Sequence, residues 1–67
     1  MSLEKAIILL EASQFGHNIG DIVPKGTALG VLKGKPVVAP FDSKIRSVSF
    51  DSEEHILTVV LVEVKDS

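Results

Sequence analysis

The most informative part of the chain reads Gly20-Asp21-Ile22-Val23-Pro24-Lys25-Gly26-Thr27-Ala28-Leu29, and after a short lysine-bearing turn it continues as Val37-Val38-Ala39-Pro40-Phe41-Asp42. Proline presets φ for a turn, and glycine tolerates the positive φ that many turns require. Pro24-Lys25-Gly26 therefore predicts a turn with the proline at its second position. Lys33-Gly34 predicts a two-residue hairpin loop between strands at 29–32 and 37–39. We expect Ile22 and Val23 to return the chain to the core.

The segments on either side of this stretch complete the pattern of a small β domain. Apart from the adjacent polar pair Arg46-Ser47, residues 45–50 alternate apolar and polar side chains with period two, which predicts a strand. Residues 51–54 predict a turn, and residues 56–64 predict a long final strand, buried on both faces for part of its length. Residues 13–21 read as a loop. The regular succession of short strands and turns favours a barrel or sandwich.

Residues 5–11 admit two interpretations. A helix would place Leu3, Ala6, Ile7 and Leu10 on one face, whereas a strand would bury the apolar run on both sides, and so short a run cannot be assigned from periodicity alone. We favour the strand because the rest of the chain is punctuated like an all-β domain.

Composition limits the size of the domain and the classes of partner. The 67 residues make one domain, 45% hydrophobic, with three Phe and no Trp or Tyr, so Val, Ile and Leu must supply most of the core. A net charge of -2 with scattered lysines argues against nucleic-acid binding. No signal peptide is readable, and no apolar run is long enough to span a bilayer, so we expect no membrane association. The absence of cysteine excludes disulfides and thiolate metal sites and agrees with a cytoplasmic protein.

The glycine-rich pattern resembles the half-barrel repeat of biotinyl and lipoyl carrier domains, and the resemblance extends from Gly20 to Phe50. The matching residues of the first part are Gly20, Asp21, Val23, Gly26 and Leu29. Ala39, Pro40 and Asp42 match the segment that leads out of the attachment hairpin. The resemblance implies that residues 1–67 form a single biotinyl/lipoyl-like domain, an all-β flattened barrel or sandwich called a barrel-sandwich hybrid.

In that family the hairpin presents a lysine for covalent attachment of biotin or lipoate, which makes Lys33 the first candidate here and Lys35 the second. The chain departs from the family around this hairpin. Neither Asp-Lys-Ala nor Met-Lys-Met occurs, Ser43 replaces the glycine expected after Asp42, and the second glycine corner is missing.

These departures favour a non-catalytic scaffold or interaction domain that has no cofactor and that binds a protein partner or itself. The alternative is a swinging-arm carrier with biotin or lipoate on Lys33 or Lys35, serving a carboxylase or a 2-oxoacid dehydrogenase-type complex. A third interpretation is a regulatory or docking domain of a larger pump or transferase subunit.

The remaining polar side chains predict no enzyme. His17 and His55 have acidic neighbours, but no ligand spacing supports a metal site. Asp51, Glu53 and Glu54 are most simply turn residues, rather than a general acid–base pair. No nucleophile elbow and no phosphate-binding loop is present.

The apolar segment 56–62 has two interpretations. It is either a central strand, or an edge that pairs with a partner or with its own copy. The second interpretation predicts a homodimer through the C-terminal strand.

Overall fold

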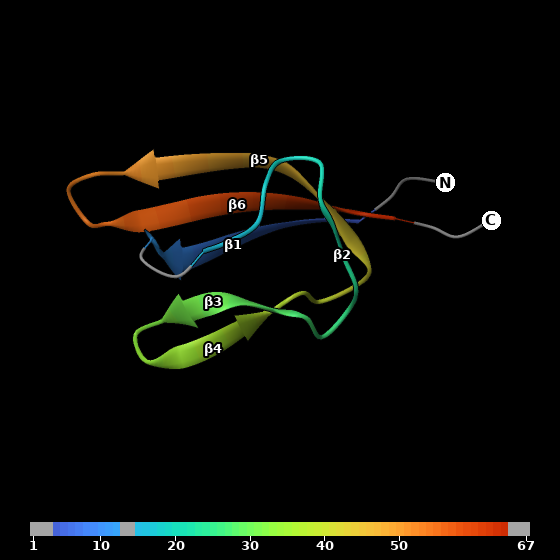
Figure 1. Ribbon diagram of the computed structural model, residues 1–67, viewed down its shortest axis with the longest axis horizontal. Coiled ribbons are helices and arrows are strands. Elements are labelled where there is room, and N and C mark those ends of the chain that lie inside the picture. The colour runs from blue at the N-terminus through green and yellow to red at the C-terminus, as the bar shows by residue number, and fades with distance from the viewer. Residues whose placement is uncertain (1–3, 13–14, 65–67) are drawn as a thin grey trace.

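The computed structural model describes residues 4–12 and 15–64 and contains six strands (Figure 1). The strands are β1 (Lys5–Glu11), β2 (Ile22–Val23), β3 (Ala28–Leu32), β4 (Lys35–Val38), β5 (Ser43–Asp51) and β6 (Ile56–Glu63). Within the described ranges there is no α-helix, so the predicted all-β class is confirmed. Residues 5–11 form a strand, and the helical interpretation of that segment is wrong.

The strands form two antiparallel sheets of unequal size. The larger sheet has the order β1-β6-β5-β2 and curls strongly into a half-barrel, while β3 and β4 form a separate hairpin beside β1 (Figure 1). β6 lies between β1 and β5 and pairs with both along its length. The interpretation of segment 56–62 as a central strand is therefore confirmed, and its interpretation as a free edge is wrong. Self-association in general stays a prediction.

The core lies between the concave face of the larger sheet and the β3–β4 hairpin. As the composition predicts, it is aliphatic: no aromatic side chain of the described residues is fully buried. The buried members are Leu10, Val23, Leu29, Ala39, Ile45, Leu57, Val59 and Leu61. They come from β1, β2, β3, β5 and β6 and from the residue after β4, so the core joins both sheets into one unit.

Only the concave face of the larger sheet is fully covered. In a strand, successive side chains point to opposite faces. Val23 is buried, but its neighbour Ile22 is 57% exposed, so the prediction that both would reach the core is wrong for Ile22. In β1, Ile7 and Leu9 are likewise exposed, contrary to the predicted burial on both sides. β6 alternates buried and half-buried residues, so one of its faces is buried rather than both.

The two glycines of the sequence pattern close two turns of the same kind. The N–H of Asp21 donates to the C=O of Asn18 at 3.1 Å, and the N–H of Thr27 donates to the C=O of Pro24 at 3.0 Å. In each turn the third residue is the glycine with positive φ, +97° at Gly20 and +86° at Gly26. The turn at Gly26 is confirmed, but Pro24 takes its first position and not the predicted second one.

Residues 37–42, the second part of the pattern, form hydrogen bonds with the Gly26 turn. Ala39 accepts a hydrogen bond from the N–H of Gly26 at 2.9 Å and donates its own N–H to the C=O of Thr27 at 3.0 Å. The Asp42 carboxylate accepts the N–H of Lys25 at 2.8 Å. These bonds explain why the two parts of the pattern occur in one chain: the later part supplies the partners of the turn that the earlier part makes.

Ser43 stands where the resemblance to carrier domains implies a glycine. It is fully buried at the start of β5, and its hydroxyl donates a hydrogen bond to the C=O of Phe41. A buried polar group is tolerated when it has such a partner. The hydroxyl thus stabilises the bend at 40–42, and Ser43 does not adopt a positive φ.

Candidate functional site

The candidate attachment hairpin has the predicted geometry. Leu32 pairs with Lys35, which leaves Lys33 and Gly34 as the two loop residues between β3 and β4. Both have positive φ, +53° at Lys33 and +79° at Gly34, which is the conformation of a type I′ turn. Lys33 and Lys35 are both exposed. The hairpin therefore presents two lysine side chains to solvent at a tightly defined turn.

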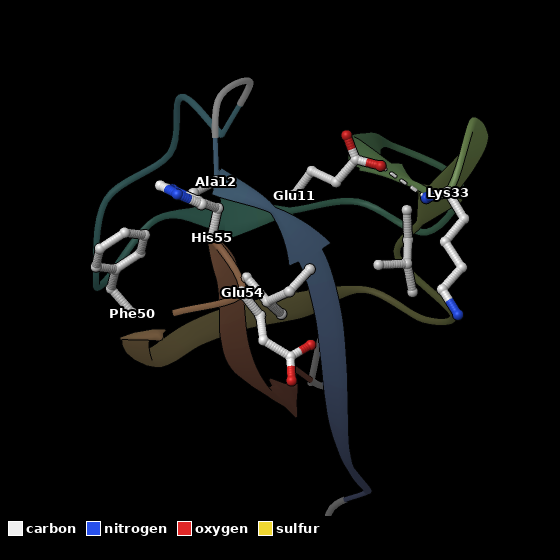
Figure 2. A pocket seen from close by; sticks show the side chains of 8 residues that line it. Glu11, Ala12, Lys33, Phe50, Glu54 and His55 are labelled. Carbon is white, nitrogen blue, oxygen red and sulfur yellow. Dashed lines mark hydrogen bonds between the residues drawn. The ribbon is translucent and has the colours of Figure 1, made fainter. Parts of the chain in front are cut away.

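A hydrogen bond fixes the hairpin tip against the end of β1. The backbone N–H of Lys33 donates to Oε2 of Glu11 at 2.8 Å (Figure 2). The side chain of Lys33 extends away from this carboxylate, so its amine lies outside the hydrogen bond (Figure 2). The turn is thereby held in place by its backbone, while its ammonium group stays accessible.

Three chain segments meet at this end of the molecule: the end of β1, the β3–β4 turn and the β5–β6 turn (Figure 1). They enclose an open hollow of about 590 Å³. It is lined by Glu11, Ala12, Leu32, Lys33, Phe50, Glu54, His55 and Ile56. The lining combines four apolar residues with two glutamates, a histidine and a lysine. Lys35 is not among the lining residues.

The hollow does not assemble a recognisable reaction centre from these charged groups. The side chains of Glu54 and His55 diverge from the β5–β6 turn (Figure 2). His55 has a positive φ of +56°, and its ring lies edge-on to Phe50 with the ring centroids 6.3 Å apart. In the described part of the chain, no three His, Cys, Asp or Glu side chains gather as a metal would require.

The turn between β5 and β6 is organised by Asp51, as expected for a turn residue. Its Oδ1 accepts the backbone N–H of Glu53 at 3.0 Å, with a longer contact of 3.4 Å to the N–H of Glu54. The carboxylate of Asp51 thus accepts hydrogen bonds from the backbone of the turn. This local structural role accounts for the carboxylate without acid–base chemistry.

His17 lies outside the hollow. Its ring packs against Phe15, with the centroids 5.6 Å apart, and its Nδ1 atom is buried without a hydrogen-bond partner. Of the two histidines that the sequence singles out, the fold therefore brings only His55 to the hollow that Lys33 lines.

Sequence reasoning located Lys33 but missed two other residues that line the same hollow. Glu11 and Phe50 reach the hollow from the ends of β1 and β5, far from Lys33 in the chain. No local pattern marks either residue, because their proximity to the hairpin is created by the pairing of β1 and β5 with β6.

Comparisons with known proteins give no match for this chain: no family model, no curated protein and no solved structure matches it. Across the described residues, the structure has no helix with the length and apolar character needed to cross a bilayer.

Proposed function

We propose that this protein is a non-catalytic interaction module of the cytoplasm, built on a biotinyl/lipoyl-like barrel-sandwich hybrid and carrying no covalent cofactor. The glycine turns at Gly20 and Gly26 and the bonds that Ala39 and Asp42 make to the second of them support the family assignment. The missing second glycine corner agrees with a degenerate member, since the turn at 52–55 leads directly from β5 into β6.

The observation that carries the interaction function is the edge strand β1. Within the described ranges, β1 pairs with β6 on one side and with no strand on the other. Its outward side chains Ile7 and Leu9 are 65% and 47% exposed. An apolar edge strand is a template for strand addition, and proteins that are not meant to associate usually protect such an edge with charge, proline or a bulge. The middle of β1 has none of these.

Site-specific photocrosslinking in the native host tests this proposal. A photoreactive residue placed at Ile7 is expected to give a specific crosslinked product. The same residue placed at Val38 is the matched control, because Val38 is also an exposed apolar side chain (46%) but belongs to the other sheet. No product from position 7, or equal products from both positions, would contradict the interaction function.

The second candidate function is the swinging-arm carrier, and the observation that favours it is the exposed Lys33 on its type I′ turn. A ligase needs an accessible amine on a defined turn, and this hairpin has one. The flanking residues that carrier families use are missing, so we place this function second. Intact-mass measurement on protein from the native host separates the two functions, and an unmodified mass is expected. A biotinyl or lipoyl increment that is abolished by Lys33→Arg or by Lys35→Arg, but not by Lys25→Arg, would establish the carrier.

A further inference from the structure

The hydrogen bonds of β1 show which of its backbone groups are free. At the two ends of the β1–β6 ladder, the N–H of Ala12 donates to the C=O of His55 at 2.9 Å and the N–H of Glu63 donates to the C=O of Glu4 at 2.8 Å. Backbone groups in an antiparallel pair alternate between the two sides of a strand. The even-numbered residues of β1 therefore bond to β6. Lys5, Ile7, Leu9 and Glu11 direct their N–H and C=O groups toward the open edge.

We infer that this edge pairs with β1 of a second copy of the chain, antiparallel, in the register that places Ile7 opposite Leu9. This inference rests on the proposed interaction function and names its partner. The register is one that the free backbone groups allow, because Ile7 and Leu9 are both residues whose N–H and C=O point outward. Each then exchanges two backbone hydrogen bonds with its counterpart. The twofold axis passes between the two copies of Ile8.

Charge complementarity selects this register over its neighbours. With Ile7 opposite Leu9, Lys5 of each copy lies opposite Glu11 of the other, so two pairs of opposite charges close the ends of the ladder. A shift that places Ile7 opposite itself would leave Lys5 opposite Leu9. A shift the other way, with Leu9 opposite itself, would place Ile7 opposite Glu11. Apolar and oppositely charged cross-strand pairs are both favourable, whereas a charge opposite an aliphatic side chain forfeits both gains.

The surroundings of Glu11 agree with this arrangement. Its Oε2 atom accepts the N–H of Lys33, so the carboxylate is held at the end of β1 to which the inferred register brings Lys5 of the copy. The hairpin approaches β1 near this end, where Gly30 faces Leu10. β3 lies beside this end of β1 without pairing with it, and the inferred ladder is centred on Ile8, between Ile7 and Leu9.

The pairing also covers the exposed apolar surface of β1. Ile7 and Leu9 of both copies come together on the outer face, and the half-buried Ile8 side chains meet on the opposite face. Because both copies use the same edge, the contact is isologous and closes at two chains. The result is a continuous sheet of eight strands with β1 of each copy at its centre.

Disulfide trapping tests the register directly, because the chain has no cysteine of its own. Ile8→Cys places two thiols opposite each other in a pair without backbone hydrogen bonds, where Cβ atoms are close enough for a disulfide. Ala6→Cys is the matched control: it lies on the same face of β1, but opposite Leu10 of the copy. Oxidation of the purified protein is expected to give a covalent dimer of Ile8→Cys and not of Ala6→Cys. Equal yields from the two variants would overturn the register.

A charge exchange tests the same pairing without a covalent bond. Sedimentation velocity over a concentration series is expected to show a dimer that Lys5→Glu weakens roughly tenfold, because two attractive pairs become repulsive. The double variant Lys5→Glu with Glu11→Lys restores opposite charges and is expected to recover most of that loss. Lys25→Glu makes the same change of net charge on an exposed turn and should leave the association unchanged.

The outcomes separate this inference from the function on which it rests. A purified protein that stays monomeric throughout the series overturns self-pairing. If position 7 then still crosslinks to a different protein in the host, the interaction function stands with another partner. If it gives no crosslink, both fail. A dimer that responds to neither Lys5→Glu nor the double variant also overturns the inference, because it forms through another surface.

Discussion

The carboxylate of Asp42 accepts the backbone N–H of Lys25 at 2.8 Å, across 17 positions of the chain. The bond joins the turn before β3 to the segment after β4, so it closes the base of the β3–β4 hairpin. The hairpin tip is fastened separately by the bond from the N–H of Lys33 to Glu11. A hairpin held at both ends keeps Lys33 and the hollow beside it in a defined place.

Removal of the Asp42 carboxylate is expected to loosen the base of the hairpin. Asp42→Ala should lower the free energy of unfolding by about 1 kcal/mol, since the N–H of Lys25 loses its acceptor. Asp42→Asn retains an acceptor oxygen and should recover most of that loss. Urea denaturation followed by circular dichroism measures both variants. Equal destabilisation by Ala and Asn would mean that the charge, and not the hydrogen bond, is what matters.

The type I′ turn predicts opposite effects at its two positions. Gly34→Ala should lower the free energy of unfolding by about 1 kcal/mol because φ is +79° at this residue. Lys33→Asn should raise it by a few tenths of a kcal/mol, roughly, since asparagine tolerates the left-handed conformation better than lysine does.

Gly16→Ala is the matched control for the turn variants, because Gly16 lacks a positive φ and an added Cβ there would meet no atom within 4 Å. Thermal unfolding compares the three variants. A control that loses as much stability as Gly34→Ala would contradict the conformational explanation.

The contact between Leu10 and Gly30 predicts a compensating pair of substitutions. Leu10 is fully buried, so Leu10→Ala should cost about 2–5 kcal/mol of unfolding free energy. A Cβ added at Gly30 would lie 3.4 Å from Cδ2 of Leu10, within ordinary packing distance. Gly30→Ala alone should therefore change stability little, and combined with Leu10→Ala it should recover part of the loss by filling the cavity. A double-mutant cycle measures this coupling, and strict additivity would argue against the contact.

Proline scanning of β1 checks which backbone N–H groups the β1–β6 ladder uses. Ile8→Pro removes an N–H that points toward β6 and should destabilise the fold by roughly 1–3 kcal/mol, since the partner C=O on β6 loses its donor. Ile7→Pro removes an N–H at the open edge, where proline is tolerated, and should cost much less. Chemical denaturation of the two variants gives the difference. A larger loss for Ile7→Pro would reverse the assigned direction of the hydrogen bonds and remove the basis for pairing at that edge.

Short-range features were predictable because they depend on backbone conformation within a few residues. Lys33-Gly34 predicts a two-residue loop since glycine adopts a positive φ without strain, and the structure has that loop. The alternation in 45–50 predicts β5 for the same kind of reason. Predictions that needed knowledge of a distant neighbour were less successful. The sequence predicts Ile22 in the core, but Ile22 lies on the uncovered face of the sheet.

The amino-acid sequence alone determined where the chain turns and where it extends, because glycine, proline and the period of apolar residues act over two to six positions. The tertiary structure decided which strands are neighbours, and with that the surfaces available for function. It placed β6 at the centre and left β1 at an edge with Ile7 and Leu9 in solvent. It also brought Glu11 to the backbone of Lys33. Such contacts join segments more than twenty residues apart, and only the packing of the whole chain around one core specifies them.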